Sequence, residues 1–149
     1  MDMPALPAAM VKRPDSDTQL LLGLQPSSAG IILLVEDDDQ IASLISLILG
    51  RVSRRMLRAR DCASGLQLFE EHRPGIDLVI VDSLLPDGDG GELCQQLRRA
   101  RPKLPVLLTS GRDQSRLAGL MKGGATAFLP KPFLPMDVER NIAGLLGVA

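Results

Sequence analysis

The segment Ile76–Val81 reads IDLVIV and is followed directly by Asp82. It is short, almost wholly apolar and rich in β-branched residues, which is typical of a strand buried on both faces of a parallel sheet. Open parallel sheets bind ligands at the carboxyl ends of their strands. The segment therefore predicts a central strand that presents Asp82 at a ligand-binding edge.

Short apolar runs recur on both sides of this strand and alternate with segments of helical periodicity. The predicted strands are Ile31–Val35, Met56–Arg60, Ile76–Val81, Val106–Leu108 and Ala127–Leu129. The predicted helices are Gln40–Leu49, Ala63–His72, Gly91–Ala100, Asp113–Lys122 and Asp137–Leu146. Such alternation predicts an α/β fold with five βα units around a parallel sheet. Right-handed crossovers make it a doubly wound three-layer sandwich.

Residues 1–28 differ from the rest of the chain. Prolines interrupt them at Pro4, Pro7, Pro14 and Pro26, with Ser and Asp between. This composition predicts a disordered extension ahead of one domain over residues 29–149. The whole chain has 149 residues, a length that suits a single domain.

Composition excludes several classes of protein. The net charge is −1, which gives no sign of a nucleic-acid or membrane surface. No apolar run reaches the roughly 18 residues that a membrane helix needs, and no signal peptide is recognisable. Cys62 and Cys94 lie far apart and are interpreted as reduced, partly buried thiols. We expect a cytoplasmic protein with no direct nucleic-acid or membrane partner.

Every predicted strand except the second is followed by charged or hydroxyl side chains. They are Glu36, Asp37 and Asp38 after the first strand, Asp82 after the third, Thr109 and Ser110 after the fourth, and Lys131 after the fifth. Because the carboxyl ends of parallel strands meet at one edge, we expect these side chains to form one site.

The chemistry of such a site follows from its charges. Carboxylates that converge from two strands repel each other, and a hard divalent cation such as Mg²⁺ relieves the repulsion. A carboxylate such as Asp82 can then attack phosphorus and form an acyl phosphate. The Lys131 ammonium and the Thr109 hydroxyl are suited to the negative charge on the transferred oxygens.

Each residue taken singly has a plainer interpretation. The acidic run Glu36–Asp39 could simply begin a helix, because Asp is common at helix starts. Asp82 could be a turn residue, Thr109 a strand-end hydroxyl and Lys131 a surface charge. Their joint arrangement, each at its own strand end, favours a functional site.

Four motifs in this order, spread over residues 30–147, resemble the receiver domain of two-component response regulators, the CheY-like superfamily. They are Ile31–Asp38 (IILLVEDD), Val79–Gly90 (VIVDSLLPDGDG), Leu107–Gly111 (LLTSG) and Gly124–Phe133 (GATAFLPKPF). The resemblance implies a flavodoxin-like fold with strand order 2-1-3-4-5. It also implies a phosphorelay switch, not an enzyme, that takes a phosphoryl group from a histidine kinase or phosphotransfer protein and signals to an unknown downstream protein.

The resemblance also assigns roles at the predicted site. Asp82 is expected to be the phosphoacceptor. Mg²⁺, or Mn²⁺ in its place, is expected to be held by Asp37 and Asp82 directly, by Glu36 through water, and by the backbone carbonyl of Leu84. Glu36 stands where the family more often has Asp.

Two further roles concern the phosphoryl group and the switch. Thr109 and Lys131 are expected to bind the phosphoryl oxygens. Thr109 and Phe128 are expected to move together and repack a protein-interaction face, although Phe128 could equally be a plain core residue. Pro132 stands where the family has a cis-proline. The state of assembly is expected to be a monomer or a phosphorylation-dependent dimer.

Two other functions compete with the receiver interpretation. Haloacid-dehalogenase-type phosphatases also use an Asp nucleophile with Mg²⁺, but they place a second acid two residues later, where this chain has Leu84 after Asp82. Glu36 and Asp38 have that spacing, but the nucleophile would then be a Glu. The other alternative is a degenerate receiver that docks a partner without being phosphorylated.

Overall fold

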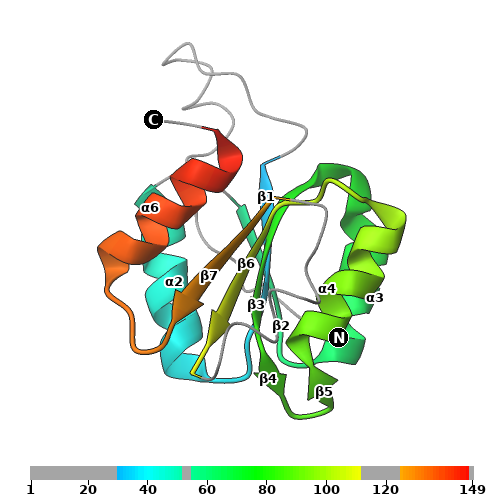
Figure 1. Cartoon of the computed structure of the whole chain (residues 1–149), viewed down its shortest axis with the longest axis horizontal. Coiled ribbons are helices and arrows are strands. Elements are labelled where there is room, and N and C mark those ends of the chain that lie inside the picture. The colour runs from blue at the N-terminus through cyan, green and yellow to red at the C-terminus, as the bar shows by residue number, and fades with distance from the viewer. Residues whose placement is uncertain (1–29, 52–54, 112–124, 148–149) are drawn as a thin grey trace.

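A five-stranded parallel sheet forms the centre of the molecule, with helices on both faces (Figure 1). This computed structural model describes residues 30–51, 55–111 and 125–147. The strands are β1 (Ile31–Val35), β2 (Arg55–Ala59), β3 (Ile76–Asp82), β6 (Val106–Ser110) and β7 (Thr126–Pro130). Their order in the sheet is β2-β1-β3-β6-β7. With β6 and β7 as the fourth and fifth strands, this confirms the predicted doubly wound α/β sandwich and the flavodoxin-like order 2-1-3-4-5.

The helices form the two outer layers of the sandwich. They are α2 (Asp39–Arg51), α3 (Cys62–His72), α4 (Gly90–Ala100) and α6 (Pro135–Leu146), and a short 3-10 turn, η1 (Arg73–Gly75), precedes β3. Figure 1 shows α2 and α6 on one face of the sheet and α3 and α4 on the other. The predicted helix Asp113–Lys122 and the predicted extension 1–28 lie outside the described residues.

The central strands separate two hydrophobic cores. In β1, Ile31, Leu33 and Val35 pack on the side of α3 and α4, whereas Ile32 and Leu34 pack on the side of α2 and α6. All five residues are buried. Side chains alternate between the faces of a strand, so a strand covered on both faces must be apolar throughout. This explains why the short apolar runs predicted the strands correctly.

The two cysteines differ in how deeply they are buried. Both cysteines are free thiols, but Cys94 is fully buried, not partly buried as expected, because α4 turns it into the core. Cys62 is partly buried.

Within the described ranges, no helix is long and apolar enough to cross a membrane.

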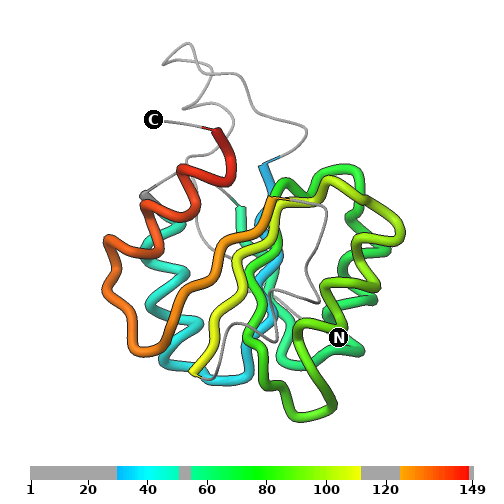
Figure 2. The backbone as a smooth tube through the Cα atoms, viewed as in Figure 1, coloured from blue at the N-terminus to red at the C-terminus, as the bar shows by residue number. Residues whose placement is uncertain are grey.

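A small antiparallel hairpin, which the sequence analysis did not predict, follows the central strand. Its strands are β4 (Leu84–Leu85) and β5 (Gly88–Asp89), joined by Pro86 and Asp87. Figure 2 shows the chain leaving the sheet after β3, forming this hairpin and then turning back into α4. The hairpin therefore lies beside the carboxyl end of β3.

Gly90 fixes the place where the hairpin joins α4. Its N–H donates to the Ser83 carbonyl at 2.9 Å. A Cβ atom at this position would lie 2.0 Å from the backbone oxygen of Asp82 and 2.8 Å from a methyl group of Val81. Only glycine allows this approach, which holds the start of α4 against the end of β3.

Candidate functional site

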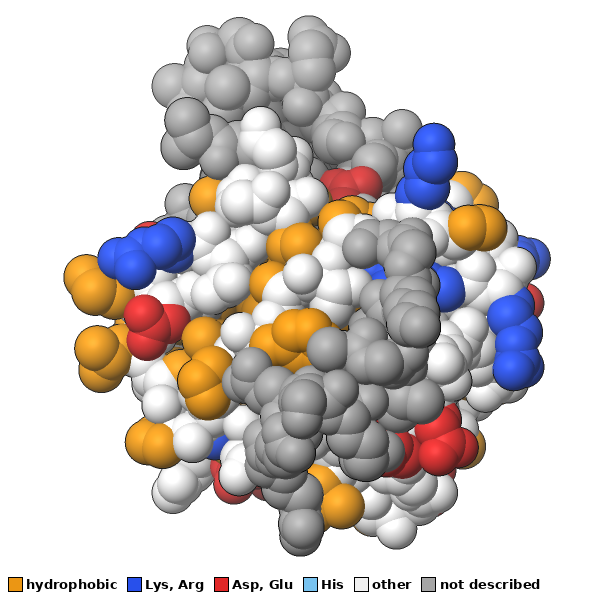
Figure 3. Space-filling model, in the orientation of Figure 1, with side chains coloured by type: hydrophobic (Ala, Val, Ile, Leu, Met, Phe, Trp, Pro, Cys, Tyr) orange, Lys and Arg blue, Asp and Glu red, His pale blue; other side chains and the backbone are white. Residues whose placement is uncertain are grey.

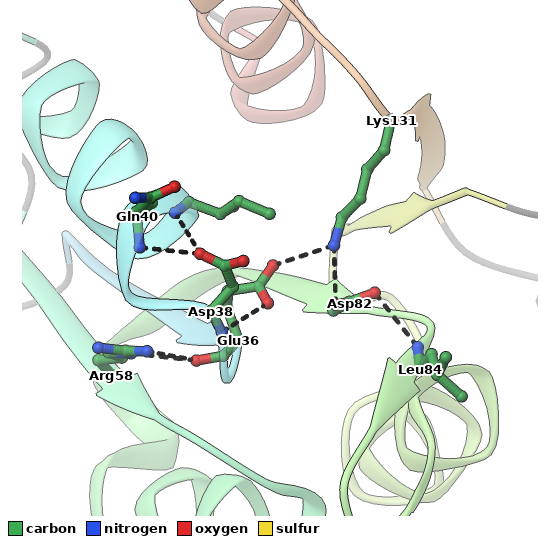
Figure 4. Close-up of polar contacts among 8 residues, drawn as sticks. Glu36, Asp38, Gln40, Arg58, Asp82, Leu84 and Lys131 are labelled. Carbon is green, nitrogen blue, oxygen red and sulfur yellow. Dashed lines mark hydrogen bonds and ion pairs between the residues drawn. The ribbon is translucent and has the colours of Figure 1, made fainter.

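The carboxyl ends of β1, β3 and β7 bring three charged side chains together (Figure 4). Lys131 Nζ lies 2.8 Å from Asp82 Oδ2 and 3.5 Å from Glu36 Oε1. Glu36 follows β1 directly and Asp82 ends the neighbouring strand β3, so the parallel register places them side by side. Lys131 follows β7, where its N–H donates to the Ser110 carbonyl at 2.9 Å.

Burial sets the electrostatics of this cluster. Glu36 is 1% exposed and Asp82 is 7% exposed. Burial raises the pKa of the Glu36 carboxyl to about 7; the hydrogen bond from the Asp38 N–H opposes the shift and the Asp82 charge adds to it. For Lys131, burial alone would lower the pKa, but the hydrogen bond to Asp82 and the Glu36 charge outweigh it and raise the pKa.

Asp37 completes an acidic group suited to a metal ion. One carboxylate oxygen each from Glu36, Asp37 and Asp82 lies within 4.8 Å of the other two, and Asp37 is exposed. Three carboxylates around one space repel each other unless a cation or protons offset their charge. Oxygen donors of this kind are the ligands that Mg²⁺ and Mn²⁺ prefer. The donor set therefore fits the hard divalent cation that was expected.

Thr109 lies next to Asp82 in the sheet. The two residues are partners in the register of β3 and β6, and the Ser83 N–H donates to the Thr109 carbonyl at 2.9 Å. The Thr109 hydroxyl is buried and has no hydrogen-bond partner among the described residues. A buried polar atom without a partner destabilises a protein, so it calls for an explanation such as a ligand group.

The acidic cluster lines an open cleft of about 690 Å³. The residues that line it are Glu36, Asp37, Asp38, Asp82, Ser83, Leu84, Leu85, Pro86, Gly111 and Lys131. The Leu84 N–H donates to Asp82 Oδ1 at 3.2 Å, while its side chain is 60% exposed. The position two residues after Asp82 therefore offers backbone polar groups and no acid.

Asp38 has a different task from the other strand-end acids. Its carboxylate accepts hydrogen bonds from the N–H groups of Gln40 at 2.8 Å and Ile41 at 3.1 Å. It therefore caps the start of α2, which is the plainer interpretation that the sequence left open for this acidic run.

The second strand contributes more than the sequence analysis expected. Arg58 of β2 donates Nε and Nη2 to the Glu36 backbone carbonyl, at 3.1 and 2.8 Å, and Nη1 to Asp39 Oδ1 at 2.9 Å. Arg60 also donates to Asp39 Oδ1, at 2.7 Å. The missed signal was a pair of arginines at the end of a strand adjacent to an acidic run.

Phe128 and Pro132 occupy the positions that the motifs gave them. Phe128 lies in β7 beside Leu108, is half-buried and packs against the core on the side of α3 and α4. The bond between Lys131 and Pro132 is cis, as expected. Ser110 is buried at the end of β6.

Comparison with known proteins agrees with this geometry. Residues 32–143 match the family model of the response regulator receiver domain. The chain is 32% identical to the alkaline phosphatase synthesis transcriptional regulatory protein PhoP of Bacillus subtilis, covering 77% of this chain and 48% of PhoP. It is 34% identical to the transcriptional regulatory protein AfsQ1 of Streptomyces coelicolor, covering 77% and 50%. The chain thus spans about half the length of these relatives.

A solved structure shows the same fold. The CheY-like receiver domain protein of Methanospirillum hungatei superposes with a TM-score of 0.73 at 27% identity, covering 80% of this chain and 94% of that one. The predicted motifs, the strand order and the matched residues all agree. The chain therefore belongs to the response regulator receiver domain family, whose members work in phosphorelay signal transduction.

Proposed function

We propose that Asp82 accepts a phosphoryl group from a phosphohistidine of a histidine kinase or phosphotransfer protein. The observation that carries this proposal is the contact of 2.8 Å between Lys131 Nζ and Asp82 Oδ2 in the open acidic cleft, with Thr109 buried beside Asp82 on the neighbouring strand. A buried carboxylate held by a cation, with an unpartnered hydroxyl on the next strand, is suited to bind a transferring phosphoryl group.

The transfer step needs one nucleophile and one leaving group. An Asp82 carboxylate oxygen attacks phosphorus and forms the new O–P bond of an acyl phosphate. The N–P bond of the donor breaks, and its electron pair stays on the imidazole, which takes up a proton from solvent. Lys131 and Thr109 then face the transferred oxygens, whose negative charge is greatest in the transition state.

The metal is assigned to the acidic side of the cleft. Asp37 and Asp82 would bind Mg²⁺ or Mn²⁺ directly, Glu36 through water, and the Leu84 backbone carbonyl would be a further ligand. A divalent ion supplies positive charge that offsets both the carboxylates and the phosphoryl oxygens. The three carboxylates within 4.8 Å of one another support this assignment.

Phosphorylation would act as a switch through Thr109 and Phe128. A phosphoryl group adds a charge of roughly −1.5 to −2 and strong hydrogen-bond acceptors. The Thr109 hydroxyl, which lacks a partner among the described residues, would turn toward it. Phe128 on the neighbouring strand is half-buried on the side of α3 and α4, so its ring could move inward and repack a protein-interaction face at the β7 edge of the sheet.

Other proteins are the proposed partners of this domain. Figure 3 shows hydrophobic side chains gathered at one side of this view and Lys and Arg scattered around its edges. The large exposed apolar residues include Leu84, which lines the cleft, and Leu134 and Met136 at the start of α6. Such residues favour protein contacts over direct nucleic-acid contacts. We propose a cytoplasmic monomer, or a dimer formed on phosphorylation, with a downstream protein still to be identified.

Intact mass after incubation with Mg²⁺ and acetyl phosphate tests the proposal. We expect a phosphate-sized gain in the wild-type chain, no gain in Asp82→Asn, and no gain when EDTA removes the metal. A domain that only docks partners would show no gain in any sample. A phosphatase would instead hydrolyse p-nitrophenyl phosphate with many turnovers, which we do not expect.

A further inference from the structure

Arg58 contacts both ends of the acidic turn, residues Glu36–Asp39, which leads from β1 into α2. Figure 4 shows its contact with the Glu36 backbone carbonyl. Two of its nitrogens, Nε and Nη2, donate to the backbone carbonyl of Glu36, and the third, Nη1, donates to the carboxylate of Asp39. The side chain is 19% exposed, so most of it is packed against the protein. A guanidinium can make these contacts together because its donors lie in one rigid plane.

Asp37 lies between the two points that Arg58 holds. The Glu36 carbonyl belongs to the peptide that joins Glu36 to Asp37, and the Glu36 N–H donates to the Ala59 carbonyl at 2.9 Å. The peptide groups on both sides of Glu36 are therefore tied to β2. Fixing them limits where the exposed Asp37 carboxylate can lie relative to Glu36 and Asp82.

We propose that Arg58 is a positioning residue for the metal site, which keeps the Asp37 carboxylate beside Glu36 and Asp82. It would act through the Glu36–Asp37 peptide and would not touch the metal. The inference rests on the proposed function, because it assumes that these three carboxylates bind Mg²⁺. Groups that orient metal ligands in this way commonly change metal affinity 10- to 100-fold when they are removed.

A plain surface ion pair is the alternative, and Arg60 is an example of one. Arg60 contacts the same Asp39 oxygen, but its side chain is 60% exposed. Among the described residues of the acidic turn, Asp39 is the one to which Arg60 donates a hydrogen bond. Exposed pairs of this kind contribute little to stability. Arg60 therefore provides a matched control, since it carries the same charge beside the same turn without contacting the Glu36 carbonyl.

The sign of the effect separates positioning from charge. Removal of a nearby cation should by itself strengthen the binding of Mg²⁺, because less positive charge would oppose the metal. Loss of a positioning contact should weaken it. Arg58→Ala and Arg60→Ala both remove one positive charge, so only the positioning role predicts that they differ.

Isothermal titration of Mg²⁺ into the full chain at fixed ionic strength makes this comparison. We expect Arg58→Ala to bind Mg²⁺ about 10- to 100-fold more weakly than wild type. We expect Arg60→Ala to bind equally or slightly more tightly. Arg58→Lys should also bind more weakly, because it keeps the charge but cannot place two donors on one carbonyl. Circular dichroism checks folding, and Arg58→Lys carries the test if Arg58→Ala unfolds.

Phosphorylation gives a second readout. In Arg58→Ala, half-maximal labelling of Asp82 should need more Mg²⁺ than in wild type, while labelling at saturating Mg²⁺ should reach the wild-type level. Folded Arg58 variants that bind Mg²⁺ as tightly as wild type, or more tightly, would overturn the positioning role alone. A wild-type chain that binds no Mg²⁺ would overturn the proposed function and this inference with it.

Discussion

Asp82 and Thr109 are register partners on adjacent strands, and the Thr109 hydroxyl is buried without a hydrogen-bond partner among the described residues. Such an unpaired buried hydroxyl costs roughly 1–3 kcal/mol of stability. The position of this hydroxyl next to a carboxylate indicates a hydrogen-bonding role that no described group of the unphosphorylated protein fulfils. Substitution of Thr109 therefore allows the effect of this hydroxyl on stability to be compared with its effect on function.

Thr109→Val should separate these two properties. Valine has nearly the same shape but no hydroxyl, so we expect the free energy of unfolding to rise by about 1 kcal/mol. Phosphoryl uptake by Asp82 should slow, because a donor to the transferred oxygens is lost. Urea unfolding followed by circular dichroism measures stability, since the chain has neither Trp nor Tyr. Thr109→Ser should keep uptake near the wild-type rate. A destabilised valine variant with normal uptake would contradict both expectations.

Gly90→Ala should strongly destabilise the domain. The new Cβ would lie 2.0 Å from the Asp82 backbone oxygen, and no side-chain rotation can relieve an overlap with backbone. We expect the free energy of unfolding to fall by about 3 kcal/mol or more, at the upper end for overpacked sites.

The matched control is Gly144→Ala in α6, where the residue is exposed and a new Cβ would meet no atom within 4 Å. That change should stabilise the helix by roughly 0.5–1 kcal/mol. Similar urea midpoints for the two variants would contradict this account.

Much of the fold follows from local sequence patterns. The buried strands, such as β1 and β3, are continuous apolar runs because both faces of the sheet are covered. The site residues Asp82 and Lys131 could be predicted to meet because parallel strands share one edge for their carboxyl ends. The ends of β1 match the prediction, whereas several other strand and helix ends differ from it by one or two residues, since the last hydrogen bonds of an element leave little trace in composition.

What the sequence could not reveal depends on contacts between distant segments. The hairpin of β4 and β5 has two residues in each strand, too few for a periodicity to be detected. The contact of Arg58 with the Glu36 carbonyl arises because β1 and β2 are neighbours in the sheet, and the arginine pair at the end of β2 does not by itself reveal which group Arg58 contacts. The capping role of Asp38 was likewise indistinguishable from a ligand role by sequence alone.

The raised pKa of Glu36 predicts how the stability of the metal-free protein depends on pH. An unfolded glutamate ionises near 4.5, whereas burial raises the pKa of Glu36 to about 7 in the folded protein. Between these values the folded state binds the extra proton, so the free energy of unfolding should fall as the pH rises from 4.5 to 7. The stabilisation is complete below 4.5 and lost above 7. Its size is on the order of 3 kcal/mol.

Urea unfolding in EDTA at a series of pH values measures this slope. Glu36→Gln is the matched control, because glutamine cannot ionise and the fall due to residue 36 should disappear. Saturating Mg²⁺ should flatten the wild-type curve as well, since metal binding favours the ionised carboxyl. Parallel curves for wild type and Glu36→Gln in EDTA would show that Glu36 does not titrate in this range.

Asp87 links the hairpin to α3, and the link should be detectable through Cys62. The Asp87 carboxylate accepts hydrogen bonds from the Cys62 N–H at 2.7 Å and the Ala63 N–H at 3.0 Å. Burial and then the Asp87 charge raise the pKa of the Cys62 thiol to about 11, so little reactive thiolate exists at neutral pH. Asp87→Asn removes the charge and keeps one of the two oxygens that accept these N–H groups. It should lower the pKa of Cys62 and speed its alkylation at pH 8 several-fold.

Peptide mass spectrometry after iodoacetamide treatment identifies the labelled cysteine, and the fully buried Cys94 should stay unlabelled in both proteins. If labelling of Cys94 rises together with that of Cys62, the faster reaction reports general unfolding and not the loss of the Asp87 charge.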